Sequence, residues 1–299
     1  MYYLVILASV FMFGGCFAMK DQYRKRRGSG LMVSMEAASI GGVAGLVVLL
    51  AVNGFTFEFS LFTLFVAGLK AINGILFSFC SFKALDRINL SLFSLYSMLG
   101  GMLLPFLQGV IFYNEPITVS KIVCVVFVSL ALICTVKRGE KKKGRIYYIG
   151  IFVLNGMSGV LSKIYTGAEI PKTSAAAYSA WCSVVTILLS LLVLLVLRLR
   201  NKEEKPRMDL DELKAERKKR IESYGIVSLS GSVNTVANFL LVMALLHVDS
   251  SVQYPMVTGG TMIVSTLISC FGKSKPNKME ITSVALAFLG MLALFLIPV

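Results

Sequence analysis

Ten long apolar stretches, separated by short polar connections, take up nearly all of the 299 residues of this chain. A helix that crosses the hydrocarbon layer of a bilayer needs about 20 apolar residues. Stretches of about that length lie at residues 2–19, 31–53, 60–82, 89–112, 118–136, 146–165, 174–197, 224–246, 250–271 and 280–297. The pattern predicts an all-α integral membrane protein with ten transmembrane helices.

The composition agrees with a membrane protein and excludes a sizeable soluble domain. Hydrophobic residues make up 56% of the chain and charged residues 15%, against about 45–50% and about 25% in soluble proteins. The six cysteines lie in apolar stretches and show no paired metal spacing, so we expect no metal and no cofactor. The net charge of +14 would suggest a nucleic-acid partner in a soluble protein. In a membrane protein the positions of the basic residues instead indicate how the chain is oriented, so we expect no nucleic-acid partner.

The basic residues predict how the chain is oriented. We number the connections between the segments from the N-terminus. Of the 30 lysines and arginines, only Lys121 and Lys172 are assigned to even-numbered connections and only Lys70 and Lys163 to apolar segments, which leaves 26 in odd-numbered connections. The positive-inside rule places the odd-numbered connections in the cytoplasm, so both termini are predicted to be extracytoplasmic. The longest connection, residues 199–222, is expected to be a charged cytoplasmic loop with a short solvated helix at 209–220, or a contact for phospholipid headgroups.

Two halves of five segments can be overlaid on each other. Residues 10–20 (VFMFGGCFAMK) align with residues 153–163 (VLNGMSGVLSK), and residues 84–101 align with 244–260. We therefore expect a first repeat at 1–137, a cytoplasmic linker at 138–145 and a second repeat at 146–299. Because five is odd, equivalent helices would run in opposite directions, which makes two inverted five-helix repeats.

Several segments resemble the drug/metabolite transporter superfamily, specifically its EamA-like ten-helix members. They are the glycine-rich first segment ending in Lys20, residues 84–105, and residues 112–118 (FYNEPIT). The last resembles the family's glycine–glutamate signature, with Asn114 in place of glycine, whereas residues 271–275 of the second half lack the acid. The resemblance implies a transporter. Family members commonly place both termini in the cytoplasm, the reverse of the orientation that the charges predict.

Polar side chains at the centres of three segments predict a binding site. Lys70, Asn155 and Asn234 lie near the middle of their segments, and ionisable groups at that depth usually face a cavity. Asn73 and Asn238 extend the polar faces by one helical turn. Segments one, three, four, six, eight and nine are expected to line the cavity. The predicted substrate-binding residues are Lys70, Asn73, Tyr96, Asn155, Asn234, Asn238, Tyr254 and Thr258.

Two further features admit alternative interpretations. The small polar residues of segments 89–112 and 250–271 suit either a cavity or close helix packing. Glu36, one turn inside segment 31–53, is expected to pair with the basic residues that precede it, the alternative being proton coupling.

The motifs of hydrolases and nucleotide-binding proteins are missing from the sequence, so we do not expect an enzyme. The prediction is a secondary transporter of a small polar metabolite, an amino acid or a related carboxylate-bearing solute, working by alternating access in the cell membrane. A proton or cation gradient could couple transport, and the chain would act as a monomer or homodimer. The alternatives are an exporter of drug-like or nucleobase compounds, and a non-transporting channel or receptor-like membrane protein.

Overall fold

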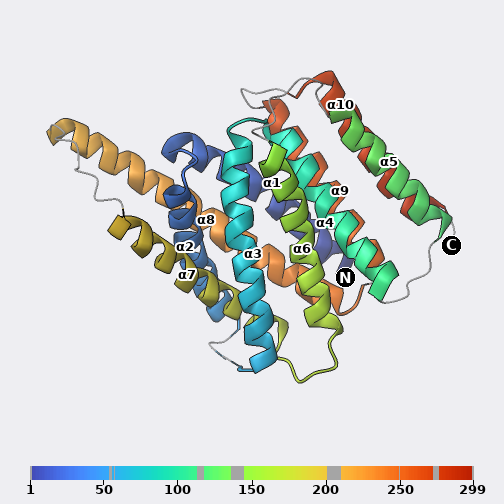
Figure 1. Ribbon diagram of the computed structural model, residues 1–299, viewed down its shortest axis with the longest axis horizontal. Coiled ribbons are helices and arrows are strands. Elements are labelled where there is room, and N and C mark those ends of the chain that lie inside the picture. The colour runs from blue at the N-terminus through green and yellow to red at the C-terminus, as the bar shows by residue number, and fades with distance from the viewer. Residues whose placement is uncertain are drawn as a thin grey trace.

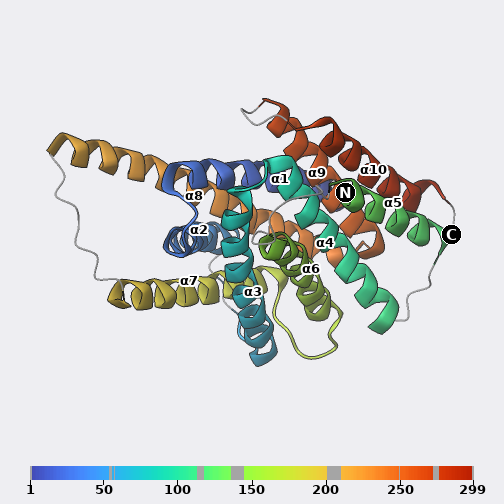
Figure 2. The same ribbon diagram turned by 45° about the horizontal axis from the view of Figure 1, so that its top comes forward.

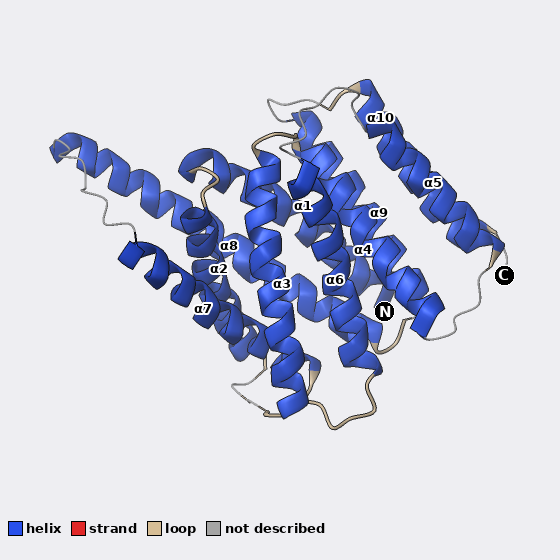
Figure 3. Ribbon diagram, viewed as in Figure 1, coloured by secondary structure: helices blue, strands red, loops and turns tan. Residues whose placement is uncertain are grey.

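The computed structural model describes residues 2–53, 56, 58–112, 118–135, 145–200, 210–248, 250–271 and 276–297. Helix is the regular structure throughout these ranges (Figure 3). The helices are α1 (Tyr2–Arg27), α2 (Leu31–Val52), α3 (Leu61–Leu85), α4 (Leu90–Phe112), α5 (Val119–Thr135), α6 (Arg145–Gly167), α7 (Ala175–Arg200), α8 (Leu210–Leu245), α9 (Ser250–Phe271) and α10 (Lys278–Leu296). The prediction of an all-α chain is confirmed.

Seven helices of the described residues are long and apolar enough to cross a membrane by length and composition. They are Tyr2–Arg27, Leu31–Val52, Leu61–Leu85, Leu92–Phe112, Ile146–Gly167, Ala175–Arg200 and Glu216–Leu245. Large apolar side chains also lie on the outside of the bundle, such as Leu4 at 71% exposure and Phe65 at 65%. A backbone inside a bilayer must satisfy its own hydrogen bonds, as these helices do. The chain is a multi-pass membrane protein.

The helices pack as a bundle with a separate pair at one edge. α1 packs against α8 and α9, and α6 packs against α3 and α4. α2 packs against both α7 and α8, while α7 also contacts α3, and α4 packs against α9. α5 and α10 pack along each other at the edge of the molecule, next to α9 and α4 (Figures 1 and 2).

Glycines allow two of these helix pairs to approach very closely. Gly41 of α2 lies against Gly231 of α8, so that a Cβ at either position would overlap or crowd the backbone of the other helix. Gly100 of α4 and Gly156 of α6 make the same kind of contact, since a Cβ on either would overlap the facing backbone. Small residues at such crossings are the usual means of packing helices in lipid, where the hydrophobic effect between helices is lost.

The first helix is longer than the apolar pattern predicts. α1 continues for two turns beyond residue 19 and ends at Arg27, where Gly28 adopts a φ of 92° and donates its N–H to the carbonyl of Arg24 over 2.7 Å. A glycine in the left-handed region is the common way to end a helix. As a result, Lys20 lies within the helix rather than in a connection.

The eighth helix corrects the prediction for the charged connection. Residues 209–220 were expected to form a separate short helix, and 199–222 a loop, but residues 210–222 are the first part of α8. Residues 216–222 are exposed and mostly charged, and this part of α8 projects beyond the other helices (Figures 1 and 2). The sequence from Leu210 to Leu245 contains no proline, and Gly225, at the change from charged to apolar residues, costs a helix only about 1 kcal/mol relative to alanine, so the helix continues through it.

Some of the predicted features fall outside the described residues. They include residues 138–144 of the expected linker, residues 113–117 of the segment that resembles the family signature, and residues 272–275 of its counterpart in the second half.

Candidate functional site

A cavity of about 180 Å³ lies between α1, α3, α4, α6, α8 and α9. These are the six helices that the sequence predicted around the site. The structure brings six of the eight predicted residues together on its wall: Asn73, Asn155, Asn234, Asn238, Tyr254 and Thr258.

A second cavity of about 290 Å³ adjoins the first and lies between α1, α2, α3, α6, α7 and α8. It contains the seventh predicted residue, Lys70, and it brings in α2 and α7, which the sequence did not place around the site. Six residues line both cavities: Phe17, Gly74, Phe77, Ser158, Asn234 and Asn238. The two cavities therefore share a wall, to which Ser158, Asn234 and Asn238 contribute polar groups.

Lys70 reaches from α3 toward α6 and α7. Its Nζ donates a hydrogen bond to the Ser162 hydroxyl over 2.7 Å, and Ser162 in turn donates to the carbonyl of Ser158 over 3.0 Å. The same amine lies 5.4 Å from the ring centroid of Tyr178, which is fully buried and stacks on Tyr165 at 3.8 Å. A neutral hydroxyl and the face of an aromatic ring thus hold the ammonium.

Two of the predicted asparagines are fixed by contacts between helices. The Asn73 side chain donates to the carbonyl of Leu154, joining α3 to α6, over 2.8 Å. Asn155 donates to the carbonyl of Ser97, joining α6 to α4, over 2.7 Å. Each carboxamide uses an N–H to satisfy a neighbouring backbone, so these residues position the wall as well as line it.

The two asparagines of α8 make no hydrogen bond to another helix among the described residues. Asn238 donates to the carbonyl of Asn234 on its own helix over 2.8 Å. The Asn234 side chain is exposed to the cavities and, among the described residues, no hydrogen-bond partner is found for its carboxamide. Its amide and carbonyl groups are available to a solute.

α9 contributes a set of polar groups at one end of the smaller cavity. The Tyr254 hydroxyl donates to the carbonyl of Gly159 over 2.9 Å, and Thr258 donates to the carbonyl of Tyr254 over 2.8 Å. Gln253 was not predicted. It is fully buried, donates to the carbonyl of Leu241 over 2.8 Å, and its Oε1 has no partner among the described residues. An unpaired buried acceptor is costly unless something else satisfies it.

Tyr96, the eighth predicted residue, belongs to a different environment. Its ring stacks on Tyr148 of α6 at 5.7 Å, and it packs against the hydrophobic cluster of α4 and its neighbours. It is not among the residues that line the two cavities. The cavity wall on α4 is formed instead by Met98 and Gly101.

Lys20 is the main residue that the sequence reasoning missed. It lines the larger cavity, with its Nζ 4.9 Å from the ring centroid of Phe77 and 5.9 Å from that of Phe82. Its alignment with Lys163 across the two halves was a signal that could have marked it. The two cavities are therefore lined by two lysines, and none of their lining residues is acidic.

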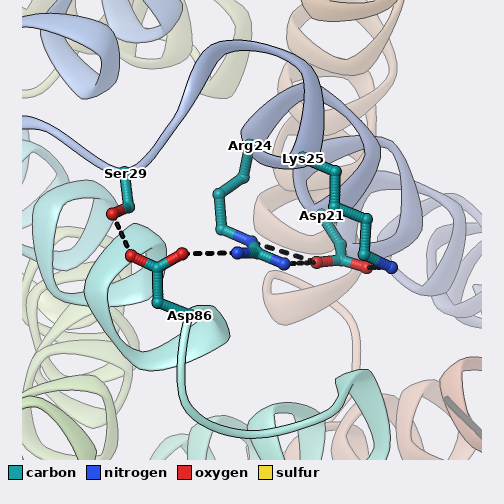
Figure 4. A network of polar contacts seen from close by, with 5 residues as sticks. All are labelled: Asp21, Arg24, Lys25, Ser29 and Asp86. Atoms are coloured by element: carbon teal, nitrogen blue, oxygen red, sulfur yellow. Dashed lines mark hydrogen bonds and ion pairs between the residues drawn. The ribbon is translucent and has the colours of Figure 1, made fainter.

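A group of acidic residues forms ion pairs at the end of the bundle that carries the basic clusters. Glu36 of α2 pairs with Arg27 of α1 at 3.2 Å and with Arg220 of α8 at 3.5 Å, which confirms the expected pairing with preceding basic residues. Asp86, after α3, pairs with Arg24 at 2.5 Å and also accepts a hydrogen bond from Ser29 (Figure 4). Arg24 also pairs with Asp21, which binds Lys25 (Figure 4). This network ties α1 to α2, α3 and α8.

Hydrogen bonds join the two halves of the chain at the opposite end as well. Ser60, at the start of α3, donates to the carbonyl of Pro171 over 2.8 Å. Glu58 accepts the N–H of Ser174, just before α7, over 2.6 Å, and its carbonyl accepts the Trp181 indole N–H over 2.9 Å. Contacts thus join the two halves at both ends of the bundle. Within the described ranges, no group of three or more His, Cys, Asp or Glu residues could hold a metal ion.

Comparisons with known proteins give the fold alone. No family model matches the chain, and no curated protein matches it. A solved structure described only as "Crystal structure of protein" is similar to it with a TM-score of 0.64 and 15% sequence identity. The match covers 97% of this chain and 94% of the other, so the fold of this bundle, over nearly its whole length, is one already seen in a crystal.

Proposed function

We propose that this chain is a secondary transporter of a small carboxylate-bearing metabolite, built from two inverted five-helix repeats with ten membrane spans. In this proposal it is an EamA-like member of the drug/metabolite transporter superfamily, located in the cell membrane. The solute binds in the two adjoining cavities at the centre of the bundle, and the halves rearrange to expose the site to each side in turn.

The pattern of helix contacts supports the inverted repeat. The test is to exchange each helix of the first half with the helix five places later, so that α1 and α6 change places, as do α3 and α8. The contact of α1 with α8 then becomes that of α6 with α3. Likewise, α1 with α9 becomes α6 with α4, and α2 with α8 becomes α7 with α3. The pairs α2–α7, α4–α9 and α5–α10 map onto themselves. Such an exchange is expected for a two-fold axis relating the halves.

The observation that carries the choice of solute is the Lys70 amine in a cavity without acids. A charge removed from water is costly unless an opposite charge or several hydrogen bonds compensate it. Ser162 supplies one neutral hydrogen bond and Tyr178 an aromatic face, but no carboxylate of the lining residues faces the amine. A solute carboxylate would complete this environment, and the free carboxamide of Asn234 would bind its polar atoms.

A thermal-shift screen of the purified protein against a panel of metabolites tests the proposal, because a ligand stabilises the state that binds it. Carboxylates are expected to raise the melting temperature of the wild type but not of Lys70→Gln. Lys83→Gln is the matched control, since it removes the same charge from the same helix outside the two cavities. Equal stabilisation of wild type and Lys70→Gln by every carboxylate would contradict Lys70 as the anchor.

A further inference from the structure

The larger cavity holds two ammonium groups rather than one. Lys20 enters it from α1 and Lys70 from α3. Lys20 has no ion pair with any described acidic residue, and the acid next to it in the chain, Asp21, pairs with Arg24 and Lys25. The rings of Phe77 and Phe82 lie beside its amine and hold the ammonium without neutralising it.

The two amines lie at different levels of the same cavity. Phe77, beside the Lys20 amine, is seven residues after Lys70 on α3, and Gly74 between them also lines the cavity. Seven residues make nearly two helical turns, so Lys70 and Phe77 share one face of α3 and their Cα atoms are separated by about 10 Å along it. A cavity of about 290 Å³ that spans this distance suits an elongated solute.

Two like charges in one cavity repel each other, and a single carboxylate can compensate only one of them. We propose that the solute carries acidic groups at both ends, one bound by Lys70 and the other by Lys20. This inference rests on the proposed function and narrows the substrate class to elongated dianions such as dicarboxylates. Phe77 and Phe82 orient the second lysine toward the cavity, and the apolar wall between the two amines contacts the solute's middle.

Binding of simple dicarboxylates to the purified full-length protein tests this proposal. The probes are the straight-chain series from succinate to sebacate, each compared by calorimetry with the ω-hydroxy acid of the same length, in which a neutral hydroxyl replaces one carboxylate. The wild type is expected to bind at least one dicarboxylate about tenfold or more tightly than its hydroxy acid, since tenfold corresponds to about 1.4 kcal/mol.

Variants assign this preference to Lys20. Lys20→Gln is expected to abolish the preference while hydroxy-acid affinity stays within about twofold, and Lys20→Arg, which retains the charge, is expected to keep it. Lys25→Gln, the same change on the exposed side of α1, should bind like the wild type. Retained melting temperature and elution volume establish that each variant is folded.

The outcomes separate this inference from the function on which it rests. Three results would overturn the proposal that Lys70 and Lys20 each bind one acidic group. They are a wild type without preference for dicarboxylates, a preference that survives Lys20→Gln, and an equal loss of affinity for dicarboxylates and hydroxy acids in Lys20→Gln. If hydroxy acids bind in those cases and lose affinity in Lys70→Gln, the proposed function stands. If no carboxylate of either series binds the wild type, both proposals fail.

Discussion

The Lys70 ammonium on α3 donates a hydrogen bond to the Ser162 hydroxyl on α6 over 2.7 Å. The contact crosses from the first half of the chain to the second. It also places the cation beside Ser158, which lines both cavities. One polar contact therefore fixes the position of the candidate binding group and joins the two halves at the centre of the bundle.

Removing that contact should destabilise the protein. Ser162→Ala leaves the Lys70 amine without its hydroxyl partner, and a hydrogen bond to a charged group contributes about 1.5–3 kcal/mol. We expect the melting temperature in detergent to fall by several degrees. Ser183→Ala is the control, because Ser183 also lines the larger cavity but donates only to Ser179 on its own helix. Equal melting temperatures for the two variants would show that the Lys70–Ser162 bond contributes nothing.

Glu36 should matter more than any exposed acid of the charged network. Its side chain is 10% exposed and pairs with both Arg27 and Arg220, so Glu36→Gln leaves two guanidinium groups partly uncompensated. We expect a loss of about 2–3 kcal/mol, between the values for buried and exposed pairs. Glu222→Gln breaks the pair with Arg26 at a side chain that is 52% exposed and should cost less than about 1 kcal/mol. Denaturation of the two variants side by side checks the order, and the reverse order would contradict it.

Gly231 should tolerate no side chain. A methyl group there would overlap the backbone of Gly41, so Gly231→Ala must push α2 and α8 apart, at a cost of about 1–3 kcal/mol or more. Gly225→Ala on the same helix meets open space and should instead stabilise by about 0.5–1 kcal/mol, because alanine favours a helix. Opposite signs in the change of melting temperature are the expected result. An unchanged melting temperature in Gly231→Ala would contradict the close contact between Gly231 and Gly41.

The helices could be predicted because their lengths follow from one physical requirement, a span of apolar residues equal to the bilayer thickness. The errors came from equating the end of an apolar stretch with the end of a helix. α1 continues past Met19 into charged sequence, and α8 begins in charged sequence fifteen residues or so before its apolar part. Hydropathy indicates which residues lie in the lipid, whereas helix propensity and helix-breaking residues such as proline and glycine determine where a helix ends.

Part of the site could be predicted because polar side chains near the centre of an apolar segment usually face a cavity. Asparagines near the centres of different helices were expected to face one cavity, and Asn73, Asn155 and Asn234 do line the same one, as polar groups at that depth avoid lipid. Lys20 was missed because it follows the apolar stretch by one residue. Tyr96, which was also predicted to bind the substrate, does not line either cavity. It lies two residues, or about 200° around the helix, from Met98, which lines the cavity. The side-chain direction depends on how each helix is rotated, which one sequence does not fix.

The orientation in the membrane remains a prediction from the charges. Both termini are expected outside and the charged part of α8 inside. Single cysteines at Tyr2, Ile297 and Lys214, each in a background without the six native cysteines, can be labelled on intact cells with a membrane-impermeant maleimide. The two terminal sites should react and Lys214→Cys should react only after lysis. Labelling of Lys214→Cys alone on intact cells would reverse the orientation.

Counterflow tests the central claim, that this chain is a carrier with its binding site at Lys70, most directly. Proteoliposomes loaded with the carboxylate that most stabilises the protein are diluted into a trace of the same labelled compound, and its uptake is followed. A carrier predicts transient accumulation of label above equilibrium, retained in Lys83→Gln and lost in a folded Lys70→Gln variant. Simple equilibration without an overshoot, or an overshoot unchanged in Lys70→Gln, would contradict the account.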